Sequence, residues 1–388
     1  MFPVIYLPPM AKPRILILTI PHGAAHTRVA NSLKKALLAA EPQVSVEVEN
    51  GLARCARWFR AYYDSYEIPL KLWPSLWGWI ENLQHHSTAT GPGWIYRQGG
   101  KPLFKFLETL DPDIVVTTEV GMCELVALHK RQSGARYMLV GATAGVDLDN
   151  PWIQPEVDFY PTFPAHIPEQ LRTAGVPPEK ILPCGTPIET GRDTALSGAK
   201  IREHLAIPGD VPLLMVMFGG TGYGKPRRLL AEIRKITRPL EVVFVAGRNL
   251  NLEQELRSRC AGNPRYHVLG WVDNIPEWMA AADLLLSKPG GATVVEAINA
   301  GLPILAFDPL PGAERRACDL IEQDQLGRWV RKASDLAPTI EALLAAPEQL
   351  ALFRKHALAL ARPHAARDAA RAILDLWNQK RAAKETER

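Results

Sequence analysis

Hydrophobic positions in the first half of the chain fall into short runs, each about as long as one buried strand. These runs occupy residues 14–19, 44–48, 114–117, 137–140 and 157–160. Segments in which apolar residues recur every three or four positions lie between them, as at 27–40 and 122–131, and this period is typical of helices. Alternating strands and helices predict an α/β domain built on a parallel, doubly wound sheet.

A second series of the same kind follows a stretch rich in Gly, Pro and Thr at 184–212. Its predicted strands are 213–218, 242–245, 267–269, 284–286 and 304–307. A chain of 388 residues is too long for one ordinary core and is expected to form two domains of roughly 180 residues each. We therefore predict domains at 1–195 and 196–362 and a last helix within 363–388, with an apolar stripe that includes Ala366, Ala370 and Ile373.

The most informative stretch is 287–314. An apolar run leads into Pro289-Gly290-Gly291, a helix follows, and Gly301 with Pro303 ends it, because glycine suits the C-cap and proline cannot continue a helix. The next apolar run completes a βαβ unit, so the loops after its two strands meet at their carboxyl ends. Open α/β sheets bind ligands there, and a helix N-terminus preceded by glycine is suited to phosphate.

This unit resembles the donor-sugar signature of glycosyltransferase family 28, most closely its glycolipid branch of monogalactosyldiacylglycerol synthases and processive diacylglycerol glucosyltransferases. That branch reads roughly T-K-P-G-G-x-T-x-x-E-A-x-x-x-G-L-P and then P-x-P-G-Q-E, against S-K-P-G-G-A-T-V-V-E-A-I-N-A-G-L-P and P-L-P-G-A-E here. Matches at 245–249 and 270–275 extend the resemblance over about 184–330. It implies a GT-B fold: two Rossmann-like domains that face a cleft, with a C-terminal helix crossing back to the first.

The resemblance also implies roles for residues of the second domain. Glu296 would accept hydrogen bonds from the ribose hydroxyls of the nucleotide, although Thr293 and Glu296 alone also fit a capping box. Trp271 is either part of this site or an aromatic of the core. The implied nucleotide-binding residues are Gly219, Gly220, Thr221, Arg248, Val272, Pro289, Gly290, Gly291, Thr293 and Glu296, and the implied sugar-binding residues are Gly312, Ala313 and Glu314.

His26 is the candidate catalytic residue. It ends the segment H-G-A-A-H between the first strand and the first helix, where the family has G-G-G-H or G-N-G-H. An inverting transferase removes a proton from the acceptor hydroxyl as that oxygen attacks C1, and histidine titrates near the working pH. The alternative is a histidine that hydrogen-bonds the first helix or fixes a lipid phosphate.

Aromatic residues crowd the segment 54–106, which contains half of the ten tryptophans. Arg54, Arg57 and Arg60 add a basic stripe. Tryptophan and tyrosine suit the bilayer interface, and arginine is attracted to anionic lipid. We expect this segment to meet the acceptor and an anionic membrane surface through Arg57, Trp77 and Trp79; packing into the first core is the alternative.

Three residues depart from the family pattern. Ala313 stands where the family has glutamine, Ala144 where it has aspartate, and Asp149 where it has histidine. Asp147 and Asp149 are candidates for a substitute base. These departures leave the donor sugar and the acceptor open.

Together the patterns predict an inverting enzyme that moves a hexose from a UDP-sugar to a lipid acceptor such as diacylglycerol. The UDP-sugar is a co-substrate, and we expect no cofactor or metal. A net charge of +4 and five scattered cysteines give no sign of a nucleic-acid partner or a metal site. Since no apolar run has the length of a membrane span, we expect a cytoplasmic protein attached peripherally to the inner face of the cell membrane.

Other interpretations stay open at this point, as does the oligomeric state. One is a UDP-N-acetylglucosamine-dependent transferase of the peptidoglycan lipid-intermediate type, and another is a non-hydrolysing UDP-sugar epimerase. A third is a nucleotide-sugar-binding subunit with weakened catalysis, which the alanines at 144 and 313 would favour.

Overall fold

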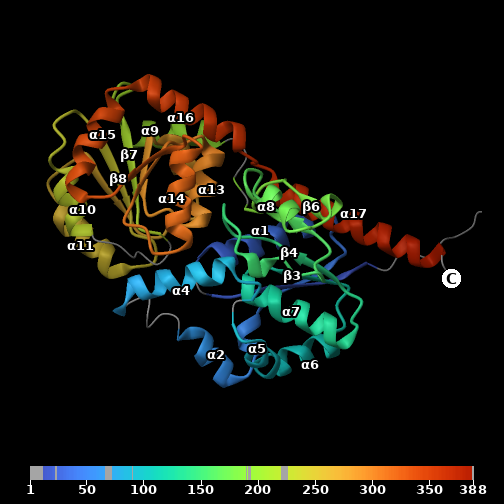
Figure 1. Ribbon diagram of the computed structural model, residues 1–388. Helices are drawn as coiled ribbons and strands as arrows, with labels where there is room; N and C mark the ends of the chain where they lie inside the picture. The colour runs from blue at the N-terminus through green and yellow to red at the C-terminus, as the bar shows by residue number, and fades with distance from the viewer. Residues whose placement is uncertain are drawn as a thin grey trace, which may run out of the picture.

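A computed structural model describes residues 12–21, 24–65, 72–89, 91–188, 190, 194–219 and 226–386. The chain forms two α/β units that lie side by side (Figure 1). The first contains a four-stranded parallel sheet in the order β2-β1-β3-β4. Its strands are β1 (Arg14–Thr19), β2 (Ser45–Asn50), β3 (Ile114–Thr117) and β4 (Met138–Gly141). Every residue of β3 and β4 is buried, as expected for a parallel sheet with helices on both faces.

Helices and turns surround this sheet. The helices are α1 (Ala24–Ala40), α2 (Arg57–Asp64), α4 (Pro74–His86), α5 (Gly93–Gly99), α6 (Lys101–Leu110), α7 (Val120–Ser133) and α8 (Ile167–Thr173). Short 3₁₀ turns lie at η1 (Gly51–Arg54), η2 (Asn150–Trp152) and η3 (Pro178–Lys180). The described residues of the segment 54–106 form helices and the turns between them, with no strand among them.

One predicted strand, at 157–160, is wrong in extent. The chain forms an isolated bridge between Phe159 and Val140, and β5 (Tyr160–Pro161) then pairs with β6 (Ile181–Leu182) in a separate small sheet. The reason is local: the Asp158 carboxylate accepts the Leu139 N–H at 2.8 Å and the Lys130 ammonium at 2.5 Å. A side chain thus takes a backbone donor that a longer strand would use.

The second domain contains a six-stranded parallel sheet in the order β12-β11-β10-β7-β8-β9. Its strands are β7 (Leu213–Met217), β8 (Glu241–Val245), β9 (Tyr266–Leu269), β10 (Leu284–Ser287), β11 (Ile304–Phe307) and β12 (Gly327–Val330). Its helices are α9 (Thr194–His204), α10 (Pro226–Ile233), α11 (Leu250–Cys260), α12 (Ile275–Ala281), α13 (Gly291–Ala300), α14 (Ala313–Gln323), α15 (Leu336–Leu344) and α16 (Pro347–Leu360), with a 3₁₀ turn at η4 (Ala333–Asp335). Counted within the domain, this is the strand order of the dinucleotide-binding fold.

The last helix, α17 (Ala365–Thr386), leaves the second domain and packs on α1 of the first, as Figure 1 shows. Its contact face is apolar, because Ala366, Ala370 and Ile373 are buried. The strand order reverses between β1 and β3 in the first domain and between β7 and β10 in the second. Doubly wound sheets bind ligands at such reversals.

Candidate active site

The strand order of the second domain reverses where β7 and β10 end, and we call this ligand-binding position of the fold the crevice. Ser287 joins the two strands by donating to the Met217 carbonyl at 3.1 Å, and the chain then passes through Pro289 into α13. Gly290 is the N-cap of α13 and makes no side-chain cap bond, so the cap residue itself leaves the first N–H groups of this helix free of a side-chain acceptor. These donors and the helix dipole create positive potential at the crevice.

Glycine is required on both sides of this crevice. Gly219 has a φ of +72°, and a Cβ there would lie 3.3 Å from Cε of Lys288. A Cβ at Gly291 would lie 2.9 Å from the Ala144 carbonyl oxygen and 2.9 Å from the Gly145 Cα, so the first domain rests directly on the start of α13. The predicted phosphate ligands Gly220 and Thr221 lie outside the described residues.

Glu296 is the most unusual polar residue of α13. It is 1 % exposed, and its carboxylate forms an ion pair with Arg28 of α1, from the other domain. Apart from that pair, neither carboxylate oxygen has a hydrogen-bond partner among the described residues. Burial raises the pKa of Glu296 from 4.5 to about 7, while Arg28 acts in the opposite direction. Buried polar groups are nearly always satisfied, so this carboxylate points to a ligand.

The capping-box alternative for Glu296 is wrong. Because α13 begins at Gly291 with Gly290 as its N-cap, Glu296 lies in the second turn and cannot reach back to the N-cap N–H. Thr293, half-buried in the first turn, is not the N-cap either.

The segment predicted to hold the donor sugar leads into α14. Gly312 is the N-cap with a φ of +87°, and Asp308, a non-glycine residue, has a φ of +53°. Such backbone conformations concentrate at ligand sites. The Glu314 carboxylate accepts from the Lys288 ammonium at 2.7 Å and from the Leu310 N–H at 2.7 Å. Glu314 therefore holds the glycine-rich crevice and the sugar segment together.

Arg248 and Trp271 stack on each other at the ends of β8 and β9. The guanidinium lies 4.1 Å from the ring centroid, and the indole N–H donates to Asp273 at 2.7 Å. Trp271 is 43 % exposed, so the core alternative for this residue is wrong. Val272 beside it is half-buried.

His26 lies at the strand-order reversal of the first domain. Its Nδ1 is 2.6 Å from the carbonyl oxygen of Thr118, which follows β3. A carbonyl oxygen only accepts, so Nδ1 carries a proton and Nε2 is the basic nitrogen of the neutral ring. Proton abstraction by Nε2 needs this tautomer. The other histidine of the segment, His22, lies outside the described residues.

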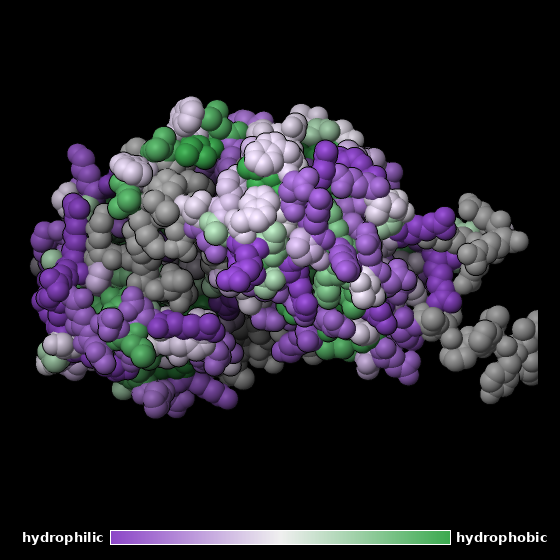
Figure 2. Space-filling view, turned by 90° about the horizontal axis from the view of Figure 1, so that it is seen from below, coloured by the Kyte–Doolittle hydropathy of each residue, from purple (hydrophilic) through white to green (hydrophobic). Residues whose placement is uncertain are grey.

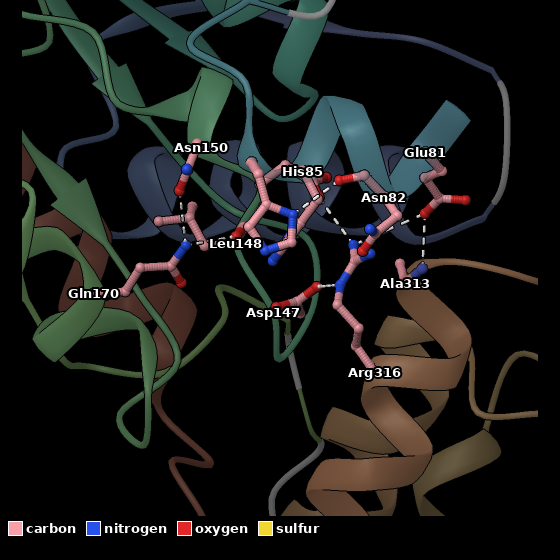
Figure 3. A network of polar contacts seen from close by, with 11 residues as sticks. Glu81, Asn82, His85, Asp147, Leu148, Asn150, Gln170, Ala313 and Arg316 are labelled. Carbon is pink, nitrogen blue, oxygen red and sulfur yellow. Dashed lines mark hydrogen bonds and ion pairs between the residues drawn. The ribbon is translucent and has the colours of Figure 1, made fainter. Parts of the chain in front are cut away.

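Asp147 and Asp149, considered as substitute bases, meet Arg316 of α14. The guanidinium contacts Asp147 and lies 2.8 Å from an Asp149 oxygen, while His85 of α4 lies 2.8 Å from the same oxygen. Figure 3 shows Arg316 reaching from α14 to Asp147 of the first domain. Since both carboxylates pair with this one cation, they serve the contact between the domains.

Three residues of this region have no counterpart in the sequence-based prediction: Arg28, Glu81 and Arg316. Each contacts a residue more than a hundred positions away in the chain. A weak signal existed for Arg28 alone, because it follows His26 on a helix whose apolar side includes Val29 and Leu33. Nothing in the pattern distinguishes Glu81 or Arg316 from surface charges.

The predicted membrane segment presents part of its aromatic side chains to solvent. Trp79 is 62 % exposed, and Arg57 is also exposed, whereas Phe59 and Tyr96 are buried. The core alternative thus holds for some of these aromatics only. The side chain of Trp77 lies outside the described part of the structure. Figure 2, a view from below, shows apolar and near-neutral surface among charged residues on this side.

Within the described residues, no helix is long and apolar enough to cross a bilayer.

Two protein families match this chain. Residues 26–188 match the monogalactosyldiacylglycerol (MGDG) synthase family, and residues 216–346 match the family of glycosyl transferases group 1. The processive diacylglycerol beta-glucosyltransferase of Bacillus cytotoxicus is 26% identical over 380 residues, which is 94% of each chain. The enzyme of the same description from Bacillus mycoides is 26% identical over 371 residues, 91% of each chain.

The resemblance to the glycolipid branch of glycosyltransferase family 28 is thereby confirmed. This chain is a glycosyltransferase. Among solved structures, MurG of Acinetobacter baumannii superimposes with a TM-score of 0.61 at 14% identity, covering 95% of this chain and 100% of that one. A putative UDP-N-acetylglucosamine 2-epimerase of Listeria monocytogenes gives 0.61 at 17% identity, covering 95% and 98%. These likenesses concern the fold, and the predicted GT-B architecture is confirmed.

Proposed function

We propose that this glycosyltransferase moves a hexose, with inversion, from a UDP-sugar to the hydroxyl of a lipid such as diacylglycerol. The observation that carries this proposal is the position of α1. This helix holds His26 on the Thr118 carbonyl and, two residues later, Arg28 on the buried Glu296 of the donor domain. A basic nitrogen and an unsatisfied carboxylate therefore belong to one cleft.

The names of the relatives support the choice of substrates. The curated relatives are processive diacylglycerol beta-glucosyltransferases, and the family matched by the first domain is MGDG synthase. Anabaena HepE, solved with UDP-glucose, has a similar fold with a TM-score of 0.50. We assign the lipid to the first domain, which matches the MGDG synthase family. We assign the donor to the second domain, which matches the glycosyl transferases group 1.

The donor would bind with its ribose hydroxyls on Glu296 and its diphosphate at Gly290 and Gly291. The uncapped N–H groups of α13 and the Lys288 ammonium lie on this side of the crevice. They would stabilise the charge that grows on the departing diphosphate. The hexose would then lie beside the segment from Gly312 to Glu314.

In the reaction, Nε2 of His26 takes the proton of the acceptor hydroxyl while the hydroxyl oxygen bonds to C1 of the sugar. The bond between C1 and the phosphate oxygen breaks, and UDP leaves with that electron pair. Attack from the face opposite the diphosphate inverts the anomeric centre. The Thr118 carbonyl holds His26 in the tautomer that this step needs.

The acceptor side would lie on a membrane. The exposed Trp79 and Arg57 belong to helices next to the cleft, and Trp77 shares α4 with Trp79. Indole rings favour the interface between lipid and water, and arginine favours anionic headgroups. We propose that this side attaches the enzyme peripherally to the cytoplasmic face of the cell membrane, where diacylglycerol is available.

The test is release of UDP from purified protein given UDP-glucose, UDP-galactose or UDP-N-acetylglucosamine, with and without diacylglycerol in anionic vesicles. We expect one of the two UDP-hexoses to give release that depends on diacylglycerol. Release that requires UDP-N-acetylglucosamine and a different acceptor would favour the peptidoglycan type. Absence of release with tight UDP binding would indicate the weakened subunit.

A further inference from the structure

Helix α4 has two faces with different surroundings. Leu76, Trp79 and Leu83 follow one another at helical spacing and are all exposed. Gly78, Glu81 and His85 form the opposite face: Gly78 and Glu81 lie against the second domain, and His85 meets Asp149 of the first domain. A Cβ at Gly78 would be 2.9 Å from Cβ of Pro311, so the backbone of α4 runs close along the segment that leads into α14.

Glu81 reaches from this face into the donor-sugar segment. Its Oε1 accepts the N–H of Ala313, the first residue of α14, at 2.7 Å, and it lies 3.8 Å from the Arg316 guanidinium. A Cβ at Gly312 would come within 1.8 Å of the Glu81 carboxyl carbon. Glycine at 312 thus makes the room that this carboxylate occupies. Figure 3 shows Glu81 on the backbone of Ala313.

The neighbouring groups cannot replace this carboxylate. Ala313 offers only a methyl group, and both oxygens of Glu314 are bonded within the second domain, to Lys288 and to the Leu310 N–H. Glu314 in turn lies next to Gly290, where a Cβ would be 3.9 Å from its Oε1. Glu81 thus lies on Gly312 and Ala313, directly before Glu314, so a hexose attached to a diphosphate at Gly290 would lie beside both carboxylates.

We propose that Glu81 is a donor-sugar-binding residue that α4 brings across the cleft. Its carboxylate accepts a hydrogen bond from a hydroxyl of the hexose and thereby sets donor specificity. This inference rests on the proposed function. A carboxylate accepts several hydrogen bonds at once, so the contact with Ala313 and a sugar hydroxyl are compatible. Because Glu81 comes from the first domain, its contact with the sugar forms only when the two domains meet. UDP alone has no hexose and therefore does not make this contact.

The experiment compares Glu81→Ala and Glu81→Gln with the unmodified protein in calorimetric titrations with UDP and with the preferred UDP-hexose. We expect unchanged UDP affinity and a loss of about tenfold in UDP-hexose affinity for Glu81→Ala, with a smaller loss for Glu81→Gln, which keeps an acceptor oxygen for Ala313. The matched control is Asp324→Ala, which removes another contact between the domains, to His166 at 3.2 Å, away from the crevice.

Titrations with UDP-hexoses that lack one hydroxyl identify the contact. In the unmodified protein and in Asp324→Ala, one deoxy donor should bind more weakly than the parent UDP-hexose. In Glu81→Ala, the same deoxy donor and the parent UDP-hexose should bind equally well. If every deoxy donor loses the same factor in Glu81→Ala as in the unmodified protein, the proposal is overturned. These measurements need no turnover, so absence of lipid glycosylation would count against the proposed function and leave this test intact.

Discussion

Arg28 of α1 and Glu296 of α13 form an ion pair between the two domains, around a carboxylate that is 1 % exposed. Burial raises the pKa of Glu296 to about 7, and apart from Arg28 neither oxygen has a hydrogen-bond partner among the described residues. Two ribose hydroxyls would supply the missing donors. The proposed nucleotide site and the contact between the domains thus share one residue.

Replacing Glu296 by alanine should weaken UDP binding by about ten- to a hundredfold, because charge-assisted hydrogen bonds of this type contribute roughly 1.5–3 kcal/mol. Calorimetric titration of the folded variant measures this. Glu348→Ala, at an exposed acid of α16, is the control and should bind UDP normally. Unchanged affinity in Glu296→Ala would remove the ribose assignment.

The stability of the protein should depend on pH through Glu296. Its pKa rises from 4.5 to about 7 on folding, so the folded state holds this proton more tightly than the unfolded state. The free energy of unfolding therefore falls as pH increases from about 4.5 to about 7 and changes no further above that range. Glu296→Gln lacks this proton. Thermal melts should show that the variant gains stability relative to the unmodified protein as pH increases through this range. If the two proteins have parallel curves of Tm against pH, the raised pKa of Glu296 would be contradicted.

Loss of His26 should slow the reaction without weakening UDP binding. We expect His26→Ala to lower turnover by roughly 10²–10⁴, the usual contribution of a general base. His26→Asn is the matched variant, because its amide can still donate to the Thr118 carbonyl but has no basic nitrogen. Equal losses in both variants support proton abstraction. Full turnover in His26→Asn would leave the residue a structural role only.

Binding to anionic vesicles should depend on the exposed side of α2 and α4. We expect cosedimentation at low salt that decreases at high salt, and a marked loss in a variant with Arg57→Ala, Trp77→Ala and Trp79→Ala. Trp271→Ala removes an exposed indole of the second domain and should cosediment normally. Vesicle binding that survives the triple change would place the lipid elsewhere, and a soluble acceptor would become the better hypothesis.

Much of the fold follows from local patterns. The runs of apolar residues predict β1, β3 and β7 closely, because strands of a parallel sheet are buried along their whole length. The order of the strands does not follow from such patterns, and it is the order that brings Thr118 to His26 and the end of β7 to Gly290. The bridge at Phe159 was also unpredictable, since it depends on where the Asp158 side chain finds its partners.

The candidate site divides in the same way. Gly290, Glu296 and Glu314 stand in one short motif whose spacing is visible in the sequence. Arg28, Glu81 and Arg316 acquire their surroundings only when the two domains meet, through contacts that span 232 positions for Glu81 and Ala313. The periodic pattern of apolar residues does not indicate which residues so far apart in the chain come into contact. The relation between α4 and the sugar segment therefore had to come from the structure.

The central claim is inverting transfer of a hexose to a lipid, and the anomeric configuration of the product tests it most directly. The protein is incubated with the preferred UDP-α-hexose and diacylglycerol vesicles, and the isolated glycolipid is analysed by proton NMR. The account predicts a β-linked hexosyl diacylglycerol, which the His26→Ala variant forms roughly 10²–10⁴ times more slowly than the unmodified protein. An α-linked product, or sugar released into water with no glycolipid formed, would contradict it.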